Sequence, residues 1–160
     1  MAVRRARGGA IIAGMDLDLV FLVANFSTTP AWLLLLLAPK WKGTGVVVHS
    51  AVMPLLLGAA YALLLFTDMG GPSDANMFTL KGVMAIFDKP QTAIAAWIHY
   101  LVFDLFVGAW VVRDAGRRDV SRLLVAPCLV GTWFFGPVGL MAYLGVTGLR
   151  GRGWSLRETA

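Results

Sequence analysis

The sequence predicts an all-α integral membrane protein, a bundle of four transmembrane helices with a short interfacial helix between the second and third. Two observations predict this fold class. Of the 160 residues, 58% are hydrophobic and only 14% are charged, which is too little charged surface for a soluble domain of this length. The apolar residues also gather into four runs of about 20, the length that a helix needs to cross roughly 30 Å of hydrocarbon.

The four runs define the expected domain organisation. They lie at residues 17–38, 45–66, 93–112 and 123–143. All four are expected to be α-helices, because at that depth only a helix satisfies its own backbone. A membrane domain over 17–147 then lies between a basic N-terminal tail at 1–16 and a basic C-terminal tail at 148–160. The expected location is integral and multi-pass, in the inner or plasma membrane of a bacterium or in a thylakoid-like membrane.

The loop between the second and third spans is too long for a simple connector. After the turn residues "GGPSD", apolar residues recur at helical spacing. This pattern predicts a short amphipathic helix from about Asp74 to Asp88, capped by Ser73 or Asp74 and lying along the membrane surface.

Three prolines lie inside the predicted spans: Pro30, Pro54 and Pro137. Each removes a backbone donor, so we expect a kink at each one. In "FFGPVGLMAY", Gly136 and Gly139 flank Pro137 and would thin and bend the fourth helix. Such a helix allows either close packing or a cavity for a flat ligand, and close packing is favoured at any single glycine.

The net charge of +5 gathers at the helix ends. Basic residues there are expected to contact anionic lipid headgroups, and not nucleic acid. The short loops expected on one face of the membrane are rich in lysine and arginine, which favours the cytoplasm for these loops and the outside for both termini. The single cysteine, Cys128, excludes an internal disulfide and a cysteine-based metal cluster.

An aspartate and a histidine lie within the third span, in "WIHYLVFDLFVGAWVVRD". Asp104 near mid-span costs on the order of 2.5–3.5 kcal/mol to insert, so it should face the bundle interior, with Asn25 or Thr29 as its favoured partner. At about 100° per residue, His99 points roughly 140° away from Asp104 and does not pair with it. The face of Asp104 includes Trp97, Tyr100 and Gly108, and the face of His99 includes Phe103, Phe106 and Trp110.

These residues also have a plainer interpretation, in which Asp104 only accepts a hydrogen bond that pins helices together and His99 only packs. Arg113 and Asp114, where the third helix leaves the membrane, are expected to be a snorkelling arginine and its neighbouring carboxylate. The sequence lacks the motifs of soluble enzymes, and two histidines, His49 and His99, cannot close a metal site. A single histidine can still supply the one axial nitrogen that a chlorophyll-type magnesium needs.

The motifs of the third and fourth spans, "WIHYLVFDLFVGAWVVRDA" and "LLVAPCLVGTWFFGPVGLMAYL", resemble a small family of four-helix membrane proteins. The family is typified by the plant neoxanthin-synthesis protein whose loss causes abscisic acid deficiency, and many bacterial members have no assigned function. The opening "DLVFLVANFSTTPAWLLLLLAPKW" resembles it too, whereas "GGPSDANMFTLKGVMAIFDKP" keeps only an apolar segment that ends near a proline. The resemblance covers residues 17–143.

The resemblance implies a role around a carotenoid: in plants, opening the epoxide of violaxanthin to the allenic alcohol of neoxanthin, a redox-neutral isomerisation. That chemistry needs an acid and a base in a dry pocket, and the residues predicted to supply them are Asp104 and His99. The sequence establishes no cofactor; a carotenoid is the expected ligand, and bacteriochlorophyll is less favoured. The residues predicted to bind the ligand are Asn25, Trp32, His49, Trp97, Tyr100, Phe103, Trp110 and Thr132.

Two other functions stay open at this point. The protein is alternatively a non-catalytic pigment-binding or auxiliary transmembrane subunit of a photosynthetic or other membrane complex, with His49 or His99 as a magnesium ligand. It is otherwise a purely structural membrane subunit. The expected partners are membrane lipids, a carotenoid and, in the subunit interpretations, a membrane protein complex.

Overall fold

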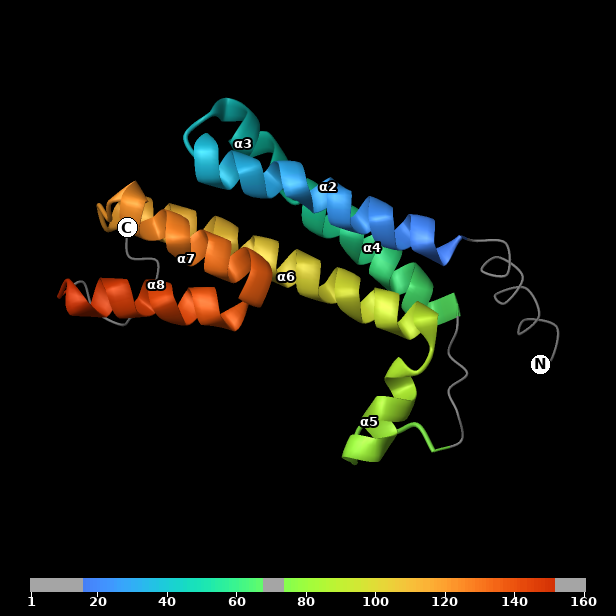
Figure 1. Ribbon diagram of the computed structural model, residues 1–160. Coiled ribbons are helices and arrows are strands. Elements are labelled where there is room, and N and C mark those ends of the chain that lie inside the picture. The colour runs from blue at the N-terminus through green and yellow to red at the C-terminus, as the bar shows by residue number, and fades with distance from the viewer. Residues whose placement is uncertain (1–15, 68–73, 152–160) are drawn as a thin grey trace. The chain divides into compact units, whose positions relative to one another are not determined.

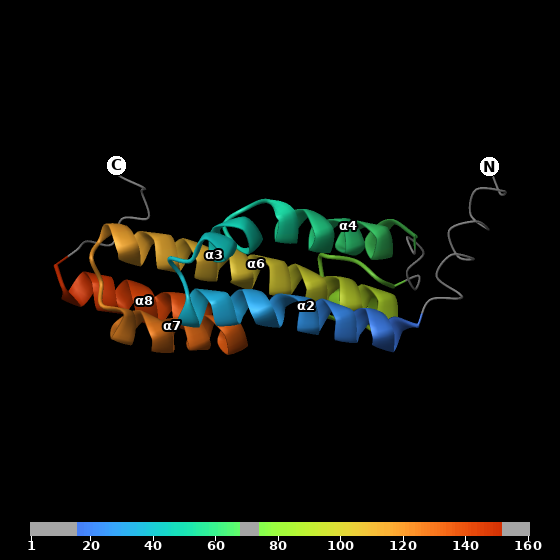
Figure 2. The same ribbon diagram turned by 90° about the horizontal axis from the view of Figure 1, so that it is seen from above.

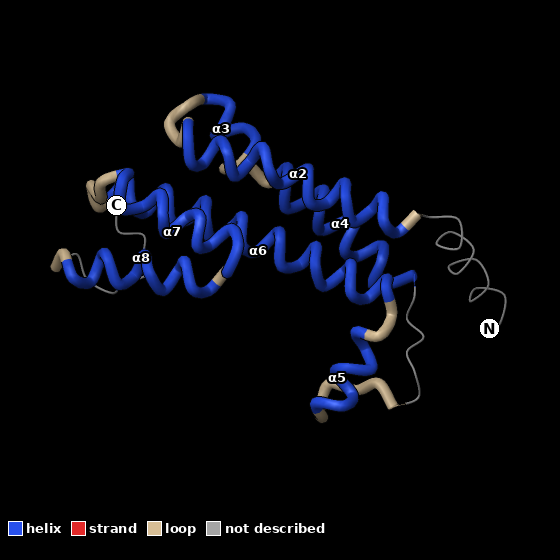
Figure 3. Tube along the Cα trace, viewed as in Figure 1, coloured by secondary structure: helices blue, strands red, loops and turns tan. Residues whose placement is uncertain are grey.

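The computed structural model describes residues 16–67 and 74–151, and within them it contains helices and no strand (Figure 3). The expected basic tails lie mostly outside the described residues, as does Ser73. The elements are α2 (Leu17–Leu37), α3 (Lys42–Val47), α4 (Val52–Thr67), α5 (Leu80–Phe87), α6 (Pro90–Arg117), α7 (Arg122–Phe135) and α8 (Pro137–Leu149) (Figure 1). The all-α fold class is therefore confirmed.

Three segments are long and apolar enough to cross a membrane: Leu17–Leu37, Lys42–Thr67 and Pro90–Arg117. They correspond to the first three predicted spans, and this composition is that of a membrane protein. The second segment is interrupted at residues 48–51, between α3 and α4. Pro54 therefore lies in the first turn of α4, where its missing N–H costs no helical hydrogen bond, and not at a kink inside a helix.

The fourth predicted span is not one helix, and this expectation is wrong at Gly136. The backbone of Gly136 has φ +48° and ψ −105°, which ends α7 and caps the start of α8. Pro137 occupies the first turn of α8, where proline fits well. The two helices fold back against each other as a hairpin, and they lie side by side in Figures 1 and 2.

The hairpin is closely packed because two glycines meet in it. A Cβ built on Gly131 would lie 3.2 Å from the Cα of Gly139. Of the two interpretations of this glycine-rich segment, the hairpin therefore supports close packing. A further proline, Pro127, lies inside α7 and was not among the predicted kink positions.

A helix lies within the segment predicted to form the interfacial helix, and it is shorter than expected. The described helix α5 starts at Leu80, six residues after Asp74, and its cap is Thr79, whose side-chain oxygen accepts a hydrogen bond from the N–H of Gly82 at 3.1 Å. Asn76 holds the preceding turn by accepting hydrogen bonds from the N–H groups of Phe78 and Thr79. The position of α5 at the membrane surface stays a prediction.

The helix α6 is longer than the predicted third span and ends at Arg117. Asp119 then adopts a left-handed conformation with φ 51°, and the N–H of Val120 donates to the carbonyl of Ala115 at 2.9 Å. This is the hydrogen bond that closes many helices whose next residue is left-handed. Because α6 continues to Arg117, Arg113 and Asp114 lie inside the helix and not at its end.

The chain divides into two compact units. Unit 1 comprises residues 1–27 and 54–101, and unit 2 comprises residues 28–53 and 102–160. The buried core of unit 1 includes Ala24, Leu64 and Ile98. The core of unit 2 is built around Trp32 and Tyr143. Asp104 belongs to unit 2 and His99 to unit 1.

Candidate functional site

Asp104 lies at the middle of α6 and is only 9% exposed, so the expectation that it faces inward is confirmed. Its carboxylate lies beside the break between α7 and α8. A Cβ built on Gly136 would be 2.9 Å from Oδ1 and 3.2 Å from Oδ2 of Asp104. Glycine is therefore required at position 136 for two reasons, which are the positive φ and the closeness of the carboxylate.

The carboxylate also lies near the first turn of α8. The opening N–H groups of a helix have no partner inside that helix and carry partial positive charge. Thr132, fully buried one turn before the break, donates from its hydroxyl to the carbonyl of Cys128 at 2.9 Å. Unit 2 thus brings a carboxylate, a helix start and a buried hydroxyl to one broken helix.

Two of the predicted ligand contacts in unit 2 are tryptophans, of which Trp32 is buried and Trp110 is half-buried. Trp32 is 1% exposed, stacks on Trp133 with ring centroids 5.7 Å apart, and lies against Gly108. Trp110 meets Tyr143 edge to face at 5.9 Å. Phe103 is instead 55% exposed. Of the predicted aromatic contacts in this unit, Phe103 is the one most open to a ligand in the surrounding lipid.

Unit 1 holds three further predicted contacts, Asn25, Trp97 and Tyr100, together with His99. The indole N–H of Trp97 donates to the side-chain oxygen of Asn25 at 3.0 Å, and the ring of Trp97 lies 5.2 Å from that of Tyr100. His99 is exposed, with its ring 5.7 Å from that of Tyr61. Asn25 and Trp97, two predicted site residues of one unit, are thus hydrogen-bonded to each other. Its pairing with Asp104, and that of Thr29, stay predictions.

The comparison with known proteins identifies the family. The family described as ABA DEFICIENT 4-like matches residues 19–143. The chain belongs to the ABA DEFICIENT 4-like family. Among curated proteins it is 31% identical, over 132 residues, to the protein ABA DEFICIENT 4, chloroplastic, of Arabidopsis thaliana; the match covers 78% of this chain and 58% of that relative. No solved structure matches it.

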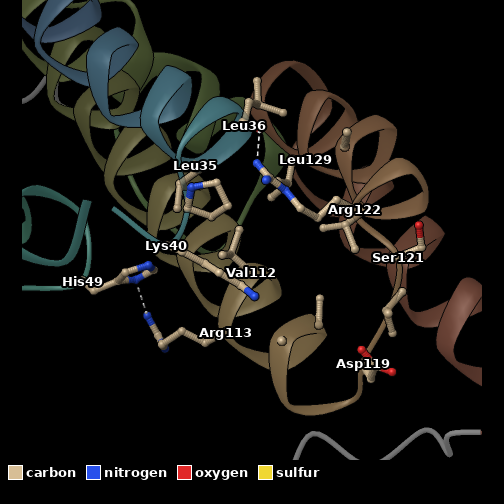
Figure 4. Close-up of a pocket in the computed structure, with 16 residues that line it drawn as sticks. Leu35, Leu36, Lys40, His49, Val112, Arg113, Asp119, Ser121, Arg122 and Leu129 are labelled. Carbon is tan, nitrogen blue, oxygen red and sulfur yellow. Dashed lines mark hydrogen bonds between the residues drawn. The ribbon is translucent and has the colours of Figure 1, made fainter. Parts of the chain in front are cut away.

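In this family member, His49 is engaged by an arginine. Nη1 of Arg113 donates to Nδ1 of His49 at 3.1 Å, because a guanidinium is only a donor (Figure 4). A neutral imidazole whose Nδ1 accepts carries its proton on Nε2, and a protonated nitrogen cannot bind a metal. This arrangement disfavours His49 as a magnesium ligand. Within the described residues, no cluster of three or more histidine, cysteine or acidic side chains has the geometry of a metal site.

The interpretation of Asp114 as no more than the carboxylate next to a snorkelling arginine is incomplete, because Asp114 is buried and paired. Asp114 is 2% exposed and accepts a hydrogen bond from the hydroxyl of Tyr143 at 2.7 Å. Nε of Arg118 lies 2.6 Å from its Oδ2, and Nη2 of Arg117 lies 3.4 Å from its Oδ1. The signal was present in the sequence, since cations three and four residues after an aspartate favour a helix that continues through them.

Proposed function

We propose that this protein acts on the end group of a xanthophyll, opening an epoxide to an allenic alcohol as its family resemblance implies. The observation that carries the proposal is the burial of Asp104, whose carboxylate lies at mid-helix against the backbone of Gly136 in a fold of apolar helices. Placing a carboxylate there is costly, which favours a chemical role. The substrate dissolves in lipid, so a multi-pass protein of the same membrane is a suitable catalyst.

The reaction is an isomerisation that needs no oxidant or reductant. One carbon–oxygen bond of the epoxide breaks and its oxygen gains a proton to become a hydroxyl. The neighbouring chain carbon loses a proton, and the electrons of that carbon–hydrogen bond form the new double bond of the allene. A carboxyl group held beside the epoxide supplies the proton, or takes it as a carboxylate, and general acid–base groups of this kind contribute roughly 10²–10⁴-fold.

In this proposal Asp104 works at the polar end group. The role of His99 as the second group rests on the sequence, since His99 lies in unit 1 and Asp104 in unit 2. A division of labour suits their different surroundings. Asp104 is buried beside the backbone of Gly136, whereas His99 is exposed, as is Phe103. We therefore assign the acid–base work to Asp104 and contact with the polyene to Phe103, and the part of His99 in the reaction stays a prediction from the sequence.

The test is production of an allenic carotenoid in a bacterial host that makes an epoxy xanthophyll. Wild-type protein should convert part of the pool, measured by chromatography and absorption spectra of extracted pigments. Asp104→Asn and His99→Ala should each abolish conversion, a loss of at least about 100-fold. Both variants should reach the membrane at wild-type levels, checked by immunoblot. Asp119→Asn, at an exposed carboxylate of the loop after α6, is the matched control and should leave conversion unchanged.

Two outcomes contradict the proposal. The first is no pigment change with the wild type across epoxy and hydroxy carotenoids. The second is unchanged conversion in both variants. A stoichiometric multi-subunit complex carrying pigment after purification in mild detergent would favour the auxiliary-subunit function instead, and loss of that complex in His99→Ala would support it directly.

A further inference from the structure

A cavity of about 530 Å³ opens in unit 2 where α2, α6 and α7 approach one another. Its wall includes three cationic side chains, Lys40, Arg113 and Arg122, together with His49 (Figure 4). We call this the basic cavity. One carboxylate, Asp119, also lines it. Cationic groups therefore outnumber anionic ones around a space whose size lies within the usual range of ligand pockets.

Two of the cations are held in place by hydrogen bonds. Nη2 of Arg122 donates to the carbonyl of Leu36 at 3.3 Å (Figure 4) and to that of Leu37 at 3.2 Å, and both are among the carbonyls left open at the end of α2. Arg113 is fixed by its hydrogen bond to His49. A freely snorkelling arginine has no such anchors, so these guanidinium groups are positioned before any ligand arrives, which lowers the entropy cost of binding.

The inner wall of the basic cavity is apolar. Leu35, Val125 and Leu129 line it and are buried. The cavity thus combines an apolar surface with cations from the α2–α3 connection, from α6 and from the start of α7. This combination fits an amphiphile with an anionic head and an apolar stem, and arginine suits a phosphate because its planar fork donates two parallel hydrogen bonds.

We propose that the basic cavity binds the phosphate group of an anionic membrane lipid, with the lipid's apolar part against Leu35 and Leu129. Lys40, Arg113 and Arg122 contact the phosphate, and Asp119 disfavours ligands that carry more than one negative charge. The site is separate from the Asp104 region and does not depend on the proposed carotenoid activity.

The test is lipid titration of the purified full-length protein by native mass spectrometry. The probes are dioleoylphosphatidylglycerol, dioleoylphosphatidylcholine and inorganic phosphate. We expect one phosphatidylglycerol to bind at least tenfold more tightly than phosphatidylcholine. Arg113→Gln or Arg122→Gln should weaken phosphatidylglycerol binding about tenfold, the effect of losing one hydrogen bond to a charged group.

Because Arg113 and Arg122 also make internal hydrogen bonds, Lys40→Gln, at an exposed loop side chain, provides a second variant and should weaken binding several-fold. The matched control is Arg150→Gln, which removes an exposed positive charge outside the cavity and should change affinity less than twofold. Equal binding of the two lipids, or an Arg150→Gln effect as large as that of the cavity variants, overturns the proposal. If inorganic phosphate displaces the lipid at equal concentration, a lipid is not the source of the bound phosphate, and that part of the proposal is overturned.

Discussion

Asp114 accepts contacts from side chains of two helices, and its energetics follow from its burial. A carboxylate removed from water is stabilised only when its oxygens are matched by charges and hydrogen bonds, and removing one partner of such a pair costs far more than the pair contributes. Here Arg118 supplies the nearest charge and Tyr143 a neutral hydroxyl. Asp114 therefore fastens the end of α6 to α8 inside unit 2.

Tyr143→Phe should lower the free energy of unfolding by about 1.5–3 kcal/mol, because it removes one hydrogen bond to a charged group. Asp114→Ala should cost more, about 3–5 kcal/mol, since it leaves Arg118 and the hydroxyl of Tyr143 without their acceptor. Denaturation in detergent followed by tryptophan fluorescence measures both. Tyr61→Phe, at a partly exposed ring of unit 1, is the control and should stay within about 0.5 kcal/mol. A Tyr143→Phe effect no larger than that of the control would contradict the role given to the hydroxyl.

At the scale of elements, the α7–α8 hairpin depends on backbone contact between its two helices. A Cβ built on Gly139 would lie 1.9 Å from the backbone nitrogen of Thr132 and 2.4 Å from the carbonyl carbon of Gly131. Neither atom belongs to a flexible side chain, so the helices themselves must move apart to accept a methyl group. The broken helix beside Asp104 would then lose its geometry.

Gly139→Ala should therefore lower the melting temperature of the purified protein, with a cost above the roughly 1–3 kcal/mol typical of overpacking. Gly145→Ala, in the same helix and with nothing within 4 Å of its added Cβ, is the matched control. It should be neutral or slightly stabilising, because alanine is the better helix former. Scanning fluorimetry in detergent compares the two, and equal melting temperatures would show that the hairpin does not need its close approach.

The apolar helices were predicted well from the sequence, but the positions where they break or end were predicted less well. Length and hydropathy were enough for the first three spans, and the cost of a charge in lipid was enough to predict that Asp104 is buried. The fourth span failed because a glycine–proline pair is compatible with both a kink and a reversal, and only the positive φ of Gly136 distinguishes them. Asp114 was missed because hydropathy ended the third span at residue 112, five residues before α6 ends.

The basic cavity was also beyond prediction from the sequence. Its lining comes from three helices and three connections whose proximity no local pattern encodes. What the sequence did indicate was the type of charge, since short loops rich in lysine and arginine predict contact with anionic headgroups. The side chains alone did not show that Arg113 and Arg122 are held by His49 and by carbonyls of α2.

At the scale of the whole molecule, the hairpin changes the expected membrane topology. At 1.5 Å per residue, the 14 residues of α7 and the 13 of α8 each reach only about 20 Å, short of the roughly 30 Å hydrocarbon core. Because the two helices fold back on each other, the chain should enter the membrane and return to the same face. The segments before α7 and after α8 then share one side, whereas a single fourth span would separate them.

Cysteine labelling tests this topology. With Cys128 replaced by serine, cysteines introduced at Arg117 and at Arg150 should react with a membrane-impermeant maleimide from the same side of sealed vesicles, and Lys42→Cys reports on the connection between the first two spans. Leu35→Cys, at a buried position, is the control and should label only after denaturation. Reaction of positions 117 and 150 from opposite faces would restore the four-span bundle and contradict the hairpin. Reaction from the same face would place the α7–α8 break, and the carboxylate of Asp104 beside it, within the thickness of the membrane where a xanthophyll end group is reached from lipid.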